Sequence, residues 1–281
     1  MAARVTVPAV RSRKVAAGAP PLVMVTAYDA PTARLADAAD VDLLLVGDSV
    51  AMVVLGYDDT LAVTVDDMAH HTAAVARTGP RALVVADLPW MSYHVSPEDT
   101  VRNAARLVRA GATAVKLEGG AKRVPMVRAL VDAEIPVMGH LGLTPQSVHA
   151  LGGFKVQGRQ AAAADALVDD AAALVEAGAF ALVLEAVPAA LARRVTEAVP
   201  VPTIGIGAGP ACDGQVLVLH DLLGLEDRVR PRFVRRYASL RADGTAAVAA
   251  FAADVRSGAF PAPEETYEPE VRRGPAAGLP A

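Results

Sequence analysis

Residues 109–119 read RAGATAVKLEG, and residues 176–186 read EAGAFALVLEA. Each stretch contains the end of a helical pattern, a glycine, a short aliphatic run and then a glutamate. Glycine commonly ends a helix, and a short aliphatic run bounded by turn residues is typical of a buried strand. The two stretches therefore predict a repeated unit in which a strand follows a helix, and they place an acidic side chain where each strand ends.

Six more runs of this kind bring the candidate strands to eight. Each run is about four residues long and mostly aliphatic, the pattern of strands that are buried on both faces. The runs occupy residues 23–26, 43–46, 83–86, 114–117, 136–139, 181–184, 203–206 and 216–219. Helical patterns lie at residues 66–77, 96–110 and 165–177, and the second begins with Ser96 and Pro97, a strong helix start.

Strands that alternate with helices pair in parallel through right-handed crossovers, and eight such units close a barrel. We predict an α/β fold, a (β/α)8 TIM barrel with a C-terminal helical segment from residue 230 to about residue 255. The connection 207–215 is too short for a full covering helix, which leaves an open doubly wound sheet as the alternative. The predicted organisation is an N-terminal arm (1–20), one barrel with its C-terminal helices (21–258) and a flexible tail (259–281).

The composition excludes several classes of protein. A net charge of −4 from 27 basic and 31 acidic residues argues against a nucleic-acid partner, and we interpret the basic run 228–236 as a helix face or subunit contact. The single cysteine, Cys212, allows no disulfide within the chain and fits a reducing compartment. No segment has the length and apolarity of a signal peptide core or a membrane span. We therefore expect a soluble, cytoplasmic protein.

Ionisable side chains lie at or just beyond the ends of most predicted strands. Asp48, Asp87 and Glu118 each end or follow a run, and the carboxyl ends of barrel strands meet at one mouth. Three neighbouring carboxylates repel one another unless a cation neutralises them, and oxygen ligands suit Mg²⁺. The sequence thus predicts a magnesium site, with helix capping by these acids as the alternative.

Lys116, His140 and Glu185 are the other candidates at this mouth. Lys116 lies two residues before Glu118, so both side chains share one face of a strand, where the lysine binds an anionic substrate or pairs with Glu118. His140 donates to a substrate oxygen or is a satisfied core histidine. Glu185 follows an aliphatic run that favours a general base, with an ion pair to Lys116 as the alternative.

Taken together, these residues lie in phrases that resemble the ketopantoate hydroxymethyltransferase family. The resemblance extends from about residue 25 to about residue 224. Its phrases, in chain order, are VTAYDAPTARL, LLLVGDSVAMVVLGYDDTL, VVADLPWMSY, AVKLEGG, VMGHLGLTPQSV, GGFKVQG, LVLEAVP, IGIGAG and DGQVLVLHDLLG. Phe154 and Ala62 depart from the Tyr and Pro that are common in the family, and neither belongs to the predicted site.

The resemblance implies a TIM barrel related to the phosphoenolpyruvate/pyruvate enzymes, acting at the first committed step towards pantothenate and coenzyme A. It implies hydroxymethyl transfer from 5,10-methylenetetrahydrofolate to 3-methyl-2-oxobutanoate, giving 2-dehydropantoate, in a large homo-oligomer, commonly a decamer. The roles that it implies are Mg²⁺ binding by Asp48, Asp87 and Glu118, oxoacid binding by Asp48, Ser49, Asp87, Lys116 and His140, and proton removal by Glu185.

Two other functions remain open at this point. A 2-oxoacid carbon–carbon lyase or mutase of the same superfamily would share the metal and oxoacid sites but would need no folate. Such enzymes carry a reactive cysteine loop, and Cys212 lies in no such motif. A non-catalytic metabolite-binding protein would be expected to lack one of the acids, and all four are present.

Overall fold

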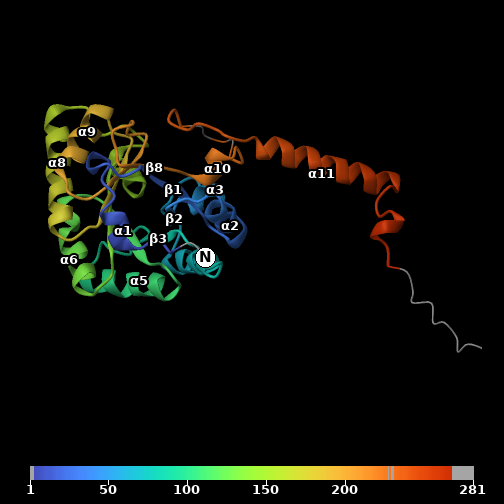
Figure 1. Cartoon of the computed structure of the whole chain (residues 1–281), viewed down its shortest axis with the longest axis horizontal. Coiled ribbons are helices and arrows are strands. Elements are labelled where there is room, and N and C mark those ends of the chain that lie inside the picture. The colour runs from blue at the N-terminus through green and yellow to red at the C-terminus, as the bar shows by residue number, and fades with distance from the viewer. Residues whose placement is uncertain (1–2, 227, 229–230, 268–281) are drawn as a thin grey trace, which may run out of the picture. The chain divides into compact units, whose positions relative to one another are not determined.

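The computed structural model describes residues 3–226, 228 and 231–267, which form two compact units, Met1–Tyr237 and Ala238–Ala281. In the first unit, eight parallel strands pair in chain order, and the last pairs with the first to close a barrel (Figure 1). The strands are β1 (Leu22–Thr26), β2 (Leu43–Val46), β3 (Leu83–Asp87), β4 (Ala114–Glu118), β5 (Val137–Gly142), β6 (Ala181–Glu185), β7 (Thr203–Ile206) and β8 (Gly214–Leu217). The predicted barrel is confirmed, and the open sheet is excluded.

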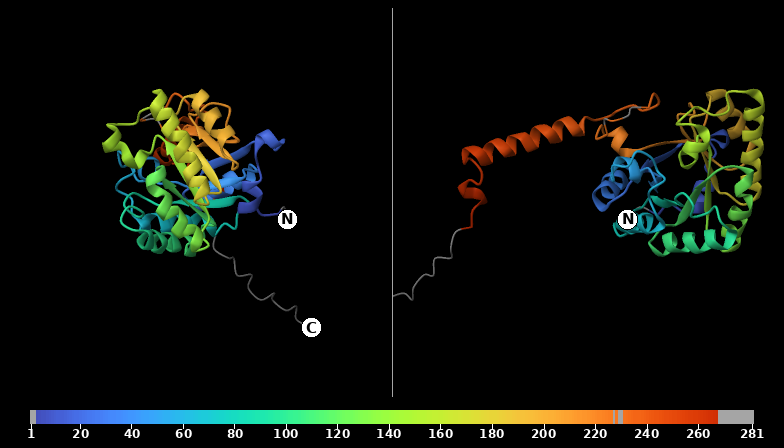
Figure 2. Two further views of the ribbon diagram at one scale, coloured as in Figure 1. Left: turned by 90° about the vertical axis from the view of Figure 1, so that its left-hand side faces the viewer. Right: turned by 180° about the vertical axis from the view of Figure 1, so that it is seen from behind.

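Helices surround the strands, and the two further views show the same arrangement (Figure 2). The α-helices of this unit are α1 (Val7–Arg11), α2 (Ala30–Ala38), α3 (Val50–Val53), α4 (Val65–Ala76), α5 (Pro97–Arg109), α6 (Val124–Asp132), α7 (Val148–Leu151), α8 (Ala161–Glu176), α9 (Ala189–Ala198) and α10 (Leu219–Leu222). Three short 3₁₀-helices are η1 (Val15–Ala17), η2 (Ala121–Arg123) and η3 (Pro145–Ser147). The predicted start of α5 is confirmed, because the Ser96 side chain accepts from the Asp99 N–H and Pro97 takes the first helical position.

Several predicted boundaries are wrong. The last strand begins at Gly214 instead of residue 216, and the short connection before it contains no helix, yet β8 still pairs with β7 and β1. The fifth strand begins after Pro136 and continues to Gly142, so His140 lies within the strand. The helix expected from residue 230 begins only at Leu240, with Ser239 at its N-cap position. The described residues of the basic run 228–236 are not helical, and positions 229 and 230 lie outside the described residues.

The second unit contains α11 (Leu240–Ser257) and η4 (Pro263–Glu265). None of the α11 residues is buried, and Val248, Phe251 and Val255 are exposed at a helical spacing. The predicted tail overlaps this unit at residues 259–267, and its remainder lies outside the described residues, so the proposed domain boundaries stay a prediction. Within the described ranges, no helix has the length and apolarity needed to cross a membrane.

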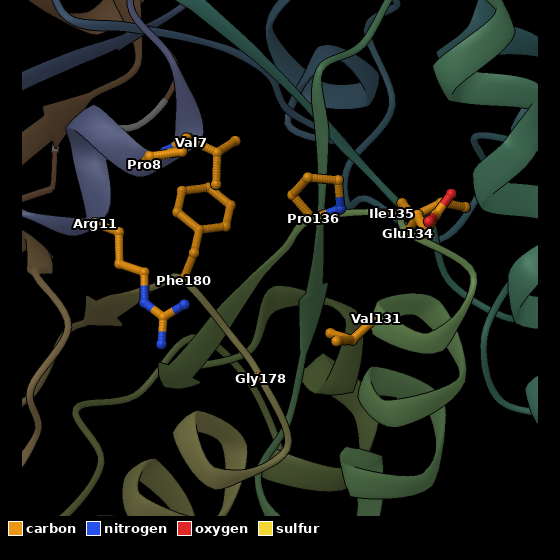
Figure 3. Close-up of a pocket in the computed structure, with 9 residues that line it drawn as sticks. All are labelled: Val7, Pro8, Arg11, Val131, Glu134, Ile135, Pro136, Gly178 and Phe180. Atoms are coloured by element: carbon orange, nitrogen blue, oxygen red, sulfur yellow. The ribbon is translucent and has the colours of Figure 1, made fainter.

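The N-terminal segment packs against the barrel end at which the strands begin. Val10 of α1 is buried in the same cluster as Phe180, which directly precedes β6. A groove of about 300 Å³ lies beside them (Figure 3). Its lining residues are Val7, Pro8, Arg11, Val131, Glu134, Ile135, Pro136, Gly178 and Phe180. Since Pro136 and Phe180 precede their strands, this groove lies at the end of the barrel opposite to the predicted site.

A buried aspartate holds the N-terminal segment in place. Asp213, 1% exposed, accepts from Lys14 Nζ at 2.8 Å, from Val15 N–H at 2.9 Å and from Thr203 N–H at 2.9 Å. Lys14 Nζ also donates to the Thr196 carbonyl at 2.7 Å. This cluster joins the segment before β1 to β7 and to the start of β8, and so fastens the seam at which the barrel closes.

We expect the Asp213→Asn variant to lower the free energy of unfolding by about 3 kcal/mol, because it leaves the largely buried ammonium of Lys14 without its counter-ion. Chemical denaturation of the two proteins measures this difference. The control is Arg102→Ala, which breaks an exposed ion pair with Asp99 on α5 and should cost less than about 1 kcal/mol. Equal destabilisation by both variants would contradict the role of Asp213.

Candidate active site

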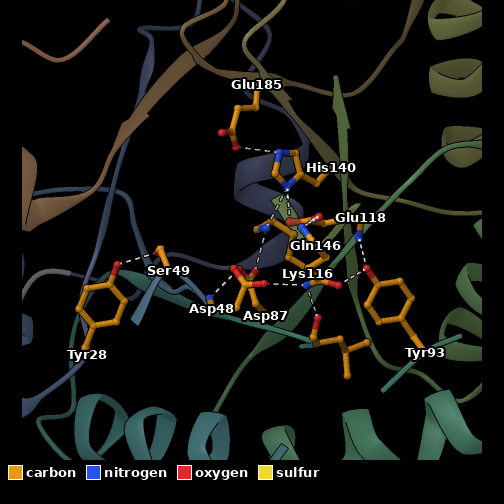
Figure 4. A network of polar contacts seen from close by, with 11 residues as sticks. Tyr28, Asp48, Ser49, Asp87, Tyr93, Lys116, Glu118, His140, Gln146 and Glu185 are labelled. Carbon is orange, nitrogen blue, oxygen red and sulfur yellow. Dashed lines mark hydrogen bonds and ion pairs between the residues drawn. The ribbon is translucent and has the colours of Figure 1, made fainter. Parts of the chain in front are cut away.

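The site is the uppermost layer of the barrel interior. Side chains along a strand alternate between its two faces, and Leu83 and Val85 of β3 belong to the buried cluster inside the barrel. Asp87 is the next residue of that series. The same step of two leads to Lys116 and Glu118 on β4, to His140 on β5 and to Glu185 on β6. The strand period therefore directs all five side chains into the mouth, and Figure 4 shows them together.

Asp48 and Ser49 reach the site from the loop that follows β2. The Asp48 backbone N–H donates to Asp87 Oδ2 at 3.1 Å, and the Ser49 hydroxyl lies 2.8 Å from the Tyr28 hydroxyl. Neither Asp87 nor Glu118 occupies an N-cap position, and Ser49, at the N-cap of α3, makes no side-chain cap bond. The helix-cap interpretation of the acids is therefore wrong.

Lys116 pairs with an acid from the neighbouring strand. Its Nζ lies 3.0 Å from Asp87 Oδ1 and 3.2 Å from His140 Nδ1. Burial alone would lower the pKa of this ammonium, but Asp87, Glu118 and Asp48 outweigh that effect and raise it. Lys116 therefore stays charged, and its ion pair is with Asp87 instead of the Glu118 or Glu185 that the sequence offered as alternatives.

His140 lies between two glutamates. Its Nδ1 is 3.3 Å from Glu118 Oε1, and its Nε2 is 3.1 Å from Glu185 Oε2. Burial and Lys116 lower the pKa of the imidazole, whereas its contacts with Glu118 and Glu185 raise it, to about 9 in total. The two glutamates therefore favour the protonated ring, whereas the neighbouring Lys116 ammonium opposes it.

The backbone around Glu185 is unusual. Gly142 has a φ of +93°, and a side chain at this position would collide with the Glu185 carbonyl, so glycine allows the two strand ends to approach. Ala186 has a φ of +46°, a region that alanine rarely occupies. Its carbonyl accepts the Gln157 N–H at 3.0 Å, which ties the predicted loop 152–158 to the residue beside Glu185.

Sequence reasoning missed two buried residues, Gln146 and Tyr93. Gln146 Nε2 donates to Asp48 Oδ2 at 2.7 Å, and the Gln146 backbone N–H donates to Glu118 Oε2 at 3.0 Å. The Tyr93 hydroxyl donates to Gln146 Oε1 at 2.6 Å and accepts from the Glu118 N–H at 3.2 Å. Both residues lie in the phrases VVADLPWMSY and VMGHLGLTPQSV, which were the only signal that could have indicated them.

Comparison with known proteins identifies the family. The sequence model of ketopantoate hydroxymethyltransferase matches residues 4–263. The 3-methyl-2-oxobutanoate hydroxymethyltransferase of Moorella thermoacetica is 62% identical over 248 residues, which are 88% of this chain and 92% of the relative. The chain belongs to the ketopantoate hydroxymethyltransferase family. A second relative, 3-methyl-2-oxobutanoate hydroxymethyltransferase 2 of Bradyrhizobium diazoefficiens, is 60% identical over 94% of this chain and 89% of its own length.

Solved structures show how this family's barrel relates to others. A phosphonopyruvate hydrolase in complex with oxalate and Mg²⁺ has a TM-score of 0.60 at 16% identity over 92% of each chain. The 2,3-dimethylmalate lyase of the PEP mutase/isocitrate lyase superfamily has a TM-score of 0.54 at 19% identity, over 96% of this chain and 92% of its own. At such identities the likeness establishes the shared fold and nothing more.

The acids of this family member have an excess of negative charge. Burial raises the pKa of Asp48, and repulsion by Asp87 and Glu118 raises it further. Burial also raises the pKa of Asp87 despite Lys116. For Glu118, His140, Lys116 and the Gln146 N–H together outweigh burial and lower the pKa. A cation beside Asp48 and Asp87 would relieve this repulsion, and carboxylate oxygens are ligands that Mg²⁺ prefers.

The arrangement fits a cation held by few protein ligands. Among the described residues, no group of three or more His, Cys, Asp or Glu side chains is arranged to hold a metal ion by itself. Mg²⁺ usually keeps several waters and binds one or two carboxylates together with substrate oxygens. Asp48 and Asp87 fit that pattern, and direct binding by Glu118 stays a prediction.

Proposed function

We propose that this chain transfers a hydroxymethyl group from 5,10-methylenetetrahydrofolate to 3-methyl-2-oxobutanoate, giving 2-dehydropantoate, with Mg²⁺ as cofactor. The observation that carries the proposal is the buried ion pair of Lys116 and Asp87, next to Asp48 and within one barrel mouth with Glu185. Membership in the family indicates the two substrates. The barrel mouth offers acids that could bind a metal ion, the Lys116 ammonium for the carboxylate of an oxoacid, and Glu185 as a separate base.

Asp48 and Asp87 would hold the Mg²⁺, with Glu118 as the third predicted ligand. When bound, the metal ion would polarise the keto group of the oxoacid and stabilise the enolate. Lys116 brings a positive charge to the site and Ser49 a hydroxyl, so both groups suit the substrate carboxylate.

We assign removal of the C3 proton of the oxoacid to Glu185. Its side chain is 16% exposed, whereas those of Asp87 and Glu118 are each 3% exposed, so Glu185 is the more accessible acid. The C3–H bond breaks, the proton goes to the Glu185 carboxylate, and the electron pair forms the enolate. The C–N bonds that join the one-carbon unit to the folate break as one water adds, which releases tetrahydrofolate. The enolate carbon bonds to the one-carbon unit, and the oxygen from water, now on that carbon, ends as the hydroxyl group.

The lyase or mutase alternative is less well supported. Relatives at about 60% identity carry the hydroxymethyltransferase name, whereas a putative phosphonomutase and the 2,3-dimethylmalate lyase are 20% and 19% identical. Burial raises the pKa of the Cys212 thiol, which therefore makes a poor nucleophile at neutral pH. We further propose a homo-oligomer, a decamer as in the family, acting in the cytoplasm, in agreement with the lone cysteine.

Turnover assays test this function. We expect 2-dehydropantoate from 3-methyl-2-oxobutanoate only when both methylenetetrahydrofolate and Mg²⁺ are present, and no product after treatment with a chelator. Added Mg²⁺ should restore the chelated enzyme, which controls for irreversible damage. Absence of product under complete conditions would refute the proposal, and product without folate would favour the lyase or mutase.

A further inference from the structure

Gln146 connects acids that come from different strands. It lies in η3, the turn that follows β5, and is 5% exposed. Its side chain donates to Asp48 Oδ2 from the loop after β2, and its backbone N–H donates to Glu118 Oε2 at the end of β4. One uncharged residue therefore binds one oxygen of each of two carboxylates that repel each other (Figure 4).

The orientation of the Gln146 amide is fixed by its partners. Its NH₂ group donates to two acceptors, Asp48 Oδ2 at 2.7 Å and the Leu88 carbonyl at 3.0 Å. Rotating the amide by 180° would place Oε1 against these two oxygens, which repel it. The amide thus donates to Asp48 through Oδ2 alone and leaves the other oxygen of that carboxylate, Oδ1, without this donor.

Tyr93 holds the other side of this amide. Its hydroxyl donates to Gln146 Oε1 at 2.6 Å and accepts the Glu118 N–H at 3.2 Å. The hydrogen bonds therefore run in one direction, from Glu118 N–H through Tyr93 to Gln146 and on to Asp48.

We propose that Gln146 and Tyr93 are positioning residues that fix the separation and orientation of Asp48 and Glu118, and thereby set the affinity of the site for a divalent cation. The inference rests on the proposed function, because it assumes that Asp48 binds the cation. Neither residue needs to touch the cation. Each acts through the carboxylate that it orients, and partners of this kind typically contribute about 10- to 100-fold to metal affinity.

The test is Mn²⁺ binding, followed by electron paramagnetic resonance, in the full chain without substrate. We expect Gln146→Met, which keeps the side-chain length but removes all three hydrogen bonds of the side-chain amide, to raise the Mn²⁺ dissociation constant by about tenfold. Tyr93→Phe removes a single oxygen and should cause a smaller rise. Both variants should also change the spectrum of bound Mn²⁺, which a purely structural role would leave as it is in the wild type.

Two matched controls accompany these variants. Gln160→Met changes an exposed glutamine that forms no side-chain cap bond, and Tyr57→Phe changes an exposed tyrosine, so both should bind Mn²⁺ like the wild type. If the wild type itself binds no Mn²⁺, the proposed function fails. If the wild type binds Mn²⁺ and folded Tyr93→Phe and Gln146→Met keep its dissociation constant and spectrum, only the positioning inference is overturned. Should Gln146→Met not fold, the result for Tyr93→Phe decides alone.

Discussion

Replacing Glu185 by glutamine is expected to slow removal of the C3 proton by about 10²- to 10⁴-fold, the usual contribution of a general base. Glutamine keeps the size of the side chain and can still accept from His140 Nε2, which lies 3.1 Å from the carboxylate. Its amide has no basic lone pair for a proton. The variant should therefore still bind the oxoacid but remove its C3 proton far more slowly.

The measurement is exchange of the C3 proton of 3-methyl-2-oxobutanoate with deuterium from solvent, followed by NMR without folate. Without folate the carbon–carbon bond cannot form, so the assay measures proton removal alone. Glu197→Gln is the control, because Glu197 is exposed on α9 in the same strand–helix unit and should leave exchange unchanged. Wild-type exchange in the Glu185→Gln variant would show that another group removes the proton.

The barrel was predictable because its signal is local. Each strand is a short aliphatic run, and burial on both faces demands such runs whatever the neighbouring strand contains. The residues at which the strands begin and end were less predictable. Residues 216–219 form the apolar run, but β8 begins at Gly214, which pairs with both Ile204 and Leu22. Those pairings depend on how the barrel closes, which the run itself does not contain.

The contents of the site were predictable, but the pairings within it were not. The strand period alone directs Asp87, Lys116, Glu118, His140 and Glu185 inward. Which of them meet depends on strand register: Asp87 is opposite Lys116, and Glu118 is opposite His140. Sequence spacing offers only neighbours on one strand, which is why it gave Glu118 as the alternative partner of Lys116.

Gln146 and Tyr93 could not be identified by the same reasoning. Each lies beyond the end of a strand, where the two-residue alternation of strand side chains no longer predicts their direction. Neither is a charged residue, and charge next to an apolar run was the signal that indicated the other site residues. The residues that Gln146 contacts lie 28 to 98 positions away along the chain. Only the three-dimensional arrangement brings these contacts together.

The Asp48→Asn variant should lose cation-dependent activity, by at least about 10³-fold, while the metal-free protein becomes more stable. Burial and the charges of Asp87 and Glu118 raise the pKa of Asp48. The folded chain therefore holds this proton to a higher pH than the unfolded chain, and stability falls as the pH rises from the unfolded pKa of about 3.9 through the folded pKa. Asparagine removes this destabilisation and can still accept from Gln146 Nε2.

Melting temperatures in chelator at several pH values, and again with Mg²⁺, measure both effects. In chelator at pH 7 the variant should melt above the wild type, and the difference should shrink as the pH falls and Asp48 becomes protonated in both states. Mg²⁺ should raise the melting temperature of the wild type, since it binds only the folded chain, and should leave the melting temperature of the variant unchanged.

The control Asp58→Asn, at an exposed position in the same connection between β2 and α4, should behave as the wild type throughout. A variant that Mg²⁺ still stabilises would show that Asp48 is not a ligand, and a variant that melts below the wild type in chelator would show that the carboxylate does not destabilise the metal-free fold.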